Sequence, residues 1–144
     1  MSSTLTSIAT RVLSTLSSLH ISFFGQSKTN ARLNAVMAYD QSNALFQAFL
    51  SQEMMYSCAL WSTDMPRIAE QLDQAQHRKI HHALTKARIK AGDRVLEIGS
   101  GWGGLAIEAA KSYGCKVDTL TLSKEQKALA DERIKALGLQ DQVC

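Results

Sequence analysis

The stretch VLEIGSGWGG, residues 95–104, decides the fold class of this 144-residue chain. An apolar run with one acid, Glu97, is followed by glycines at positions 99, 101, 103 and 104. Short apolar runs bounded by glycine are typical of buried strands, and a glycine-rich loop lets a backbone approach a ligand closely. We therefore expect a strand over 94–99 and a helix over 101–113, which Gly114 ends.

Strand and helix patterns alternate after this loop. The stretch CKVDTLTL (115–122) is rich in β-branched residues and predicts a second strand. Ser123 and Gln126 have the spacing of a capping box, which predicts a helix over 124–137. QVC (142–144) predicts the start of a third strand. This alternation predicts a parallel sheet with helices on its faces, so residues 91–144 are expected to form a partial βαβα domain of the α/β class.

Helical spacing dominates residues 31–90, which we expect to form a helical cap or lid. Apolar residues recur at helical spacing over 30–50, and Asp40 to Asn43 interrupts them, which predicts two short helices. Pro66 suits the first turn of a further helix, with Thr63 or Asp64 as its cap. Gly92 would end this helix, which we expect to be the longest of the chain.

Residues 1–30 have the composition of a flexible or presequence-like segment. The first acidic residue of the chain is Asp40, and residues 1–39 carry Arg11, Lys28, Arg32 and His20 on a Ser/Thr-rich background. Transit peptides and frayed or amphipathic N-terminal segments share this composition. Mitochondrial targeting therefore stays an alternative to a cytoplasmic location with peripheral membrane contact. The sequence has no apolar run of about 18 residues, so no membrane span is predicted.

Composition also excludes some classes of site. The formal net charge of +3 gives no argument for nucleic-acid binding. Three widely spaced cysteines without a CxxC pair indicate a reducing compartment and no disulfide or zinc framework. His77 and His81 have i,i+4 spacing on an expected helix, but the sequence supplies no third ligand beside them. No metal site is predicted.

The glycines at 99, 101 and 104 fit the dinucleotide fingerprint GxGxxG, but two features argue against NAD. A dinucleotide site needs an acid at the end of the second strand, where this chain has Thr119 to Leu122; Asp118 is expected in mid-strand. Glu97 precedes the glycines as E-x-G-x-G, a pattern of methyltransferases that use S-adenosylmethionine (SAM). NAD and a tight turn without a ligand stay the alternatives.

Five elements occur in a fixed order over residues 34–143. They are Tyr39-Asp40 with Asn43, Tyr56-Ser57-Cys58-Ala59, Ala75-Gln76 with Lys79, Gly99 to Gly104, and Leu120 to Gln126. In this order they resemble the cyclopropane-fatty-acyl-phospholipid synthase family, which includes the mycolic acid cyclopropane synthases. The family's His before Tyr-Asp is Ala38 here, and its glycine-loop Cys is Ser100. The resemblance implies a Rossmann-like SAM-methyltransferase sheet, first half only, preceded by an α-helical N-terminal segment.

The resemblance also implies a set of site residues. SAM would contact Tyr56, Ser57, Glu97, Gly99, Gly101, Thr121 and Gln126. The first two would form a lid, the glycines would pass the methionine end, and the last two would face the ribose and adenine. Cys58 would lie beside the reacting centre, where the family holds a bicarbonate ion that serves as base. The alternative for Cys58 is a small buried hydrophobic residue.

The implied activity is transfer of a methyl or methylene group from SAM to an unsaturated acyl chain of a phospholipid. The sulfonium makes the methyl electrophilic, a cis double bond attacks it, and loss of a proton to the base closes the cyclopropane ring. One alternative is a SAM methyltransferase that acts on a small molecule. Another is a catalytically incomplete fragment, because the family's remaining bicarbonate ligands and most of its lipid tunnel lie downstream of residue 144.

Overall fold

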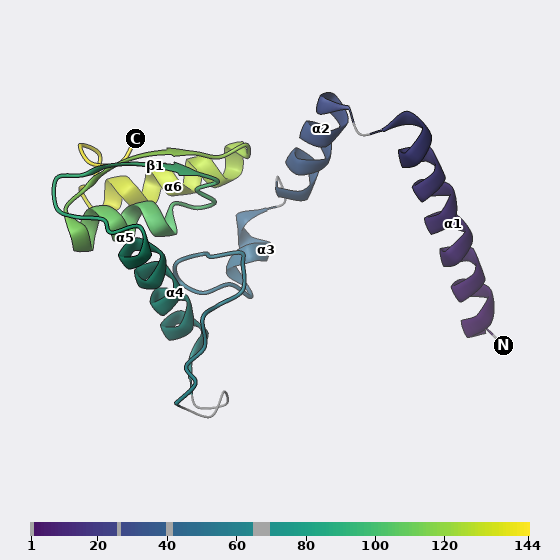
Figure 1. Cartoon of the computed structure of the whole chain (residues 1–144), viewed down its shortest axis with the longest axis horizontal. Coiled ribbons are helices and arrows are strands. Elements are labelled where there is room, and N and C mark those ends of the chain that lie inside the picture. Colours follow the sequence, from purple (N-terminus) through teal and green to yellow (C-terminus); the bar gives the residue numbers. More distant parts are fainter. Residues whose placement is uncertain (1, 26, 40–41, 65–69) are drawn as a thin grey trace. The chain divides into compact units, whose positions relative to one another are not determined.

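The computed structural model describes residues 2–25, 27–39, 42–64 and 70–144. The chain divides into two compact units, Met1–Ala35 and Val36–Cys144. Helix α1 (Ser2–Phe24) lies in the first unit, and α2 (Lys28–Tyr39) crosses the boundary between them. The remaining elements, α3 to α6 with the two strands, belong to the second unit (Figure 1).

Helix α1 occupies most of the segment expected to be flexible or presequence-like. It has 23 residues, against 15 for α4 (Leu72–Lys86), so the expectation that the helix before Gly92 is the longest is wrong. No glycine or proline interrupts the sequence before Gly25, whose φ of +64° suits the end of a helix. No helix within the described ranges is long and apolar enough to cross a membrane.

The two short helices expected over 30–50 are confirmed as α2 and α3 (Asn43–Gln47). Ser42 is the N-cap residue of α3. The proposed interruption begins at Asp40, which lies outside the described residues. Buried Phe46 of α3 anchors this helix in a small core with Met54 and Trp102.

Helix α4 starts later than the sequence predicts. Its N-cap is Gln71, whose backbone N–H donates to Gln74 Oε1 at 3.4 Å in a capping-box arrangement. Pro66, the expected first turn, lies outside the described residues, and Thr63 and Asp64 do not cap the helix. A glutamine pair can satisfy free N–H groups as Ser or Asp does, and this pair sets the start.

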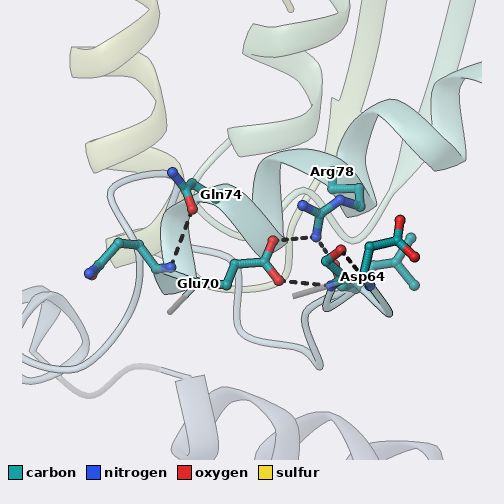
Figure 2. Close-up of polar contacts among 7 residues, drawn as sticks. Asp64, Glu70, Gln74 and Arg78 are labelled. Carbon is teal, nitrogen blue, oxygen red and sulfur yellow. Dashed lines mark hydrogen bonds and ion pairs between the residues drawn. The ribbon is translucent and has the colours of Figure 1, made fainter. Parts of the chain in front are cut away.

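One buried carboxylate links Ser62 to helix α4. Glu70 accepts a hydrogen bond from the Ser62 backbone N–H at 2.7 Å and pairs with the Arg78 guanidinium, as Figure 2 shows. The hydrogen bond from Ser62 is the largest effect and lowers the pKa of Glu70. Burial opposes this shift, and the hydrogen bond and charge of Arg78 lower the pKa further. The helix ends near Lys86, before Gly92, because Arg88 takes a left-handed φ of +56°.

The expected βαβα order is confirmed. Strand β1 (Arg94–Ile98) runs parallel to β2 (Lys116–Leu120), with α5 (Gly104–Tyr113) between them in sequence and α6 (Lys124–Ala136) after β2. Val143 forms a parallel bridge to Val117, so the third strand begins where the sequence predicted it. As expected, Ser123 caps α6 by accepting a bond from the Gln126 N–H at 3.3 Å.

The core lies on one face of this sheet, against α4, α5 and α6. Its buried members are Ile80, Leu84, Ala106, Ile107, Ala109, Ala110, Cys115, Val117, Ile134, Leu139 and Val143. The opposite face is open, because Leu96 is 64% exposed and Ile98 is 81% exposed. Among the described residues no strand pairs with the outer edge of β1. The described residues therefore cover only one face of the sheet.

Candidate functional site

A cavity of about 680 Å³ opens at the carboxyl ends of β1 and β2. We call it the strand-end cavity. Its lining comes from residues 54–57, 97–102 and 120–123, together with Gln126. Small-molecule pockets have volumes of about 300–1,000 Å³, and open α/β sheets bind ligands beyond the carboxyl ends of their strands. The strand-end cavity is thus the candidate site.

The fold brings all seven expected cofactor-binding residues to this cavity. They are Tyr56, Ser57, Glu97, Gly99, Gly101, Thr121 and Gln126. Cys58 is not among the lining residues and is exposed, so the alternative that it is a buried hydrophobic residue is wrong. Contact between these residues and a cofactor stays a prediction.

Glycine conformation shapes the floor of the cavity. Gly99 has φ +95° and Gly101 has φ +53°, and a Cβ at either position would meet no atom within 4 Å. The backbone N–H groups of Gly99 and Ser100 both donate to Leu120 O, at 2.8 and 2.9 Å. The loop is therefore tied to the end of β2 while its glycine faces stay open to the cavity.

Gly104 has a different role from the glycines before it. A Cβ there would lie 2.5 Å from Glu53 O and 3.1 Å from Met55 Sδ. The segment that precedes Tyr56 thus packs directly on the first turn of α5, which only a glycine permits. This close approach sets the position of residues 54–57 over the loop.

Glu97 is the charged residue of the cavity. It lies on β1 opposite Thr119 of β2, and Thr119 Oγ1 donates to Glu97 Oε2 at 2.7 Å. Burial raises the pKa of Glu97, while the Thr119 bond opposes this shift. A carboxyl group with these surroundings can accept hydrogen bonds or attract a cationic part of a ligand.

The polar side chains of the lining argue against a dinucleotide ligand. Among the described lining residues there is no lysine, arginine or histidine. Asp118 lies in mid-strand as expected, where it pairs with Arg94 at 2.7 Å instead of standing at the strand end. A dinucleotide would therefore lack the acid that binds its ribose. The cavity suits a neutral or cationic ligand better.

Thr121 and Gln126 form one polar unit at the far wall. Thr121 Oγ1 donates to Gln126 Oε1 at 2.7 Å, and Gln126 is buried at the start of α6. Because Ser123 caps the same turn, the side chains of this wall are held by local bonds.

Helix α4 holds the segment that carries Tyr56 and Ser57. Gln76 Nε2 donates to Ser57 O at 2.8 Å and to Met55 O at 3.3 Å. Lys79 Nζ donates to Ser57 Oγ at 2.7 Å. Sequence reasoning noted Gln76 and Lys79 but gave them no role. Their i,i+3 spacing, which places both on one face of the helix, is the signal that could have done so.

Trp102 ties the glycine loop to two other elements. It is 1% exposed, and its Nε1–H donates to Asn43 Oδ1 of α3 at 2.7 Å. Asn43 Nδ2 in turn donates to Glu125 O in α6 at 3.2 Å. Arg133 of α6 donates to Trp102 O at 2.7 Å and to Gln52 O at 3.1 Å. The motifs of the sequence include Asn43 and Trp102, but these long-range contacts and the role of Arg133 were missed because no local pattern marks them.

A family model matches this architecture. The model described as "Mycolic acid cyclopropane synthetase" covers residues 26–144. The chain belongs to this family. Among its curated relatives, a probable fatty acid methyltransferase from Pseudomonas putida is 50% identical over 105 residues, which is 73% of this chain and 26% of the relative. The cyclopropane-fatty-acyl-phospholipid synthase of Escherichia coli K12 is 41% identical over 114 residues, 79% of this chain and 28% of that protein.

Solved structures of the mycolic acid cyclopropane synthetase family agree with the fold. Mycolic acid cyclopropane synthase CmaA1, complexed with SAH and CTAB, superposes with a TM-score of 0.66 at 34% identity. The match covers 72% of this chain and 35% of that one. The chain therefore has a partial Rossmann-like fold of the SAM-methyltransferase type. It spans about a quarter of the length of the curated relatives described above.

Proposed function

We propose that this chain supplies the SAM-binding part of a SAM-dependent methyltransferase of the cyclopropane-fatty-acid synthase type. The observation that carries the proposal is the strand-end cavity, which gathers all seven residues expected at the cofactor. Family membership supports the methyltransferase class, and the complex of a related synthase with SAH supports the cofactor.

The cavity fits SAM in its chemistry. Its open glycine faces leave room for a ligand against the backbone, and its charged residue is an acid. SAM carries cationic sulfonium and ammonium groups and no phosphate, so it needs no basic side chain. When bound, SAM supplies an electrophilic methyl group. Glu97, Thr121 and Gln126 would orient it by hydrogen bonds, and Tyr56 with Met54 and Met55 would exclude water from it.

Cys58 and Lys79 are the candidates for the base region. Cys58 lies next to the lid residue Ser57, and Lys79 is close enough to Cys58 for the two to interact electrostatically. Burial nevertheless lowers the pKa of Lys79. A cation beside Cys58 would suit an anion such as bicarbonate, and we propose that site for the base.

The acceptor in this proposal is a cis-unsaturated acyl chain of a phospholipid. Helix α1 supports contact with a lipid surface, because Ile8, Val12, Leu16 and Leu19 recur at helical spacing and each is at least 49% exposed. No acid occurs before Asp40. An apolar stripe along an exposed helix can insert at the surface of a membrane, and Arg11 adds one positive charge that attracts anionic lipids.

Calorimetric titration of the 144-residue chain with SAM, SAH and NAD tests the cofactor. We expect SAM and SAH to bind in a 1:1 ratio and NAD to give no heat. Binding of NAD without a response to SAM would overturn the proposal.

Methyl-labelled SAM and phospholipid vesicles test the acceptor. Label should enter vesicles with cis-unsaturated chains and not matched vesicles with saturated chains. Binding of SAM without label in either lipid would favour the catalytically incomplete or small-molecule alternatives.

Vesicle co-sedimentation tests the role of α1. Leu16→Asp should weaken binding of the chain to vesicles, because it places a charge in the apolar stripe. Ser14→Asp, which lies on the opposite side of the helix by its spacing, should not weaken this binding.

A further inference from the structure

A second group of chemistry-bearing side chains lies where α4 packs against α5. His77 and His81 stand one turn apart on α4, and Glu108 projects from α5. Their potential ligand atoms all lie within 4.8 Å of one another. The sequence offered no third ligand for the two histidines, but the fold places Glu108 beside them. None of the three lines the strand-end cavity.

The spacing of these atoms suits a tetrahedral metal ion. His81 Nε2 lies 3.1 Å from Glu108 Oε1, and His77 Nε2 lies 3.5 Å from the same oxygen. An ion with bonds of about 2.0–2.1 Å holds the ligand atoms of a tetrahedron about 3.3 Å apart. Little movement of the side chains would therefore be needed to place one ion between these atoms.

Neighbouring groups already orient two of the three ligands. His81 Nδ1 lies 3.1 Å from Tyr113 Oη, a contact that leaves Nε2 directed at Glu108. Ser112 Oγ donates to Glu108 Oε1. Metal-binding histidines usually make such a bond through the other ring nitrogen, which fixes the ring and its tautomer.

Exposure divides the cluster into an open and a shielded side. The His77 side chain is 48% exposed and the Glu108 side chain 13%. An ion can therefore enter from the His77 side, and a water molecule can complete its coordination. Two imidazoles with one carboxylate match the preference of Zn²⁺ better than that of Ca²⁺ or Mg²⁺, which take oxygen ligands.

We propose that His77, His81 and Glu108 form a Zn²⁺ site that joins α4 to α5. The consequence lies in α4 itself, since Gln76 and Lys79 of this helix hold the lid segment at Ser57. An ion that fixes α4 against α5 would stabilise the support of the lid. The site stands on its own geometry and does not depend on the proposed methyltransferase function.

Zn²⁺ titration of the metal-stripped 144-residue chain, without SAM, tests the site. We expect one ion per chain and a higher melting temperature with Zn²⁺. His77→Ala and Glu108→Gln should each weaken Zn²⁺ binding at least about tenfold. Mutation of residues that only hydrogen-bond to a metal ligand already lowers metal affinity about 10–100-fold. His82→Ala is the matched control, because His82 is an exposed neighbour on the same helix, and it should leave binding unchanged.

Co²⁺ provides a second measurement, since tetrahedral Co²⁺ has strong visible absorption bands and an ion held only by water does not. The wild type and His82→Ala should show these bands, and His77→Ala should not. The proposal is overturned by a wild type that binds no Zn²⁺. It is also overturned if the two single variants, His77→Ala and Glu108→Gln, both fold and bind Zn²⁺ as tightly as the wild type does. Because His77 is half exposed and Gln is isosteric with Glu, both variants should fold.

Discussion

Thr119 Oγ1 donates a 2.7 Å hydrogen bond to Glu97 Oε2 across the paired strands β1 and β2. This bond is what partly offsets the cost of holding a carboxyl group inside the strand-end cavity. Burial is nevertheless the larger effect, and it raises the pKa of Glu97 above the ordinary value of 4.5. The charged form is therefore less favourable in the folded protein than in the unfolded chain.

A dependence of stability on pH follows from this shift. Well below pH 4.5 Glu97 is protonated in both states, and its raised pKa has no effect on stability. As the pH rises from there through the raised folded pKa, ionisation increasingly destabilises the fold. Glu97→Gln keeps an oxygen acceptor for Thr119 and cannot ionise. In urea unfolding of the ligand-free protein, the variant should exceed the wild type in stability at pH 7. This advantage should shrink toward pH 4.5, and an equal difference at both pH values would contradict the explanation.

Gly104 and Gly101 should respond differently to the same change. Gly104→Ala places a Cβ 2.5 Å from Glu53 O, a backbone atom, so overpacking should cost about 1–3 kcal/mol of stability. Gly101→Ala meets open space, so only its φ of +53° should cost stability, about 1–2 kcal/mol. Urea unfolding of the two variants measures this order. Calorimetry should show that Gly101→Ala also weakens SAM binding, because its methyl group faces the cavity.

Local signals were enough to predict the α/β part of the fold. The apolar runs of β1 and β2 and the Ser123 cap lie within a few residues of the elements that they determine. The start of α4 was missed because Gln71 and Gln74 cap it in place of the more usual Ser, Thr or Asp. Helix α1 was missed because its Ser/Thr-rich composition outweighed its apolar spacing.

The candidate site likewise contains residues that local sequence signals mark and contacts that they do not. The residues that line the strand-end cavity were predictable because they follow strand ends or belong to motifs, as Gly99 and Thr121 do. Contacts such as Trp102 with Asn43, 59 residues apart, have no local signature. Glu108 came beside His81 only through the packing of α5 on α4, which no single stretch of sequence specifies.

Asn43 should matter to stability through its bond to Trp102. Asn43→Ala leaves the buried Trp102 Nε1–H without its acceptor, which should cost about 1–3 kcal/mol. Asn43→Asp keeps that acceptor but places a carboxylate oxygen against Glu125 O, which repels it, so it should recover only part of the loss. Denaturant unfolding compares the two variants. If Asn43→Asp proves as destabilising as Asn43→Ala, the Trp102 bond is not what Asn43 contributes.

Tyr56 should act on the ligand more than on the fold. Its ring meets Phe46 edge-on, with centroids 5.3 Å apart, and the residue is 56% exposed beside the cavity. A ring there can exclude water and contact the sulfonium through a cation–π interaction of about 0.5–2 kcal/mol. Tyr56→Ala should therefore weaken SAM binding by up to about 30-fold, taking tenfold per 1.4 kcal/mol. Tyr56→Phe keeps the ring and should retain most of the affinity. Calorimetry and melting of the ligand-free variants separate the two roles. A Tyr56→Ala protein that loses several degrees in melting temperature yet binds SAM as the wild type does would make Tyr56 a packing residue and remove it from the site.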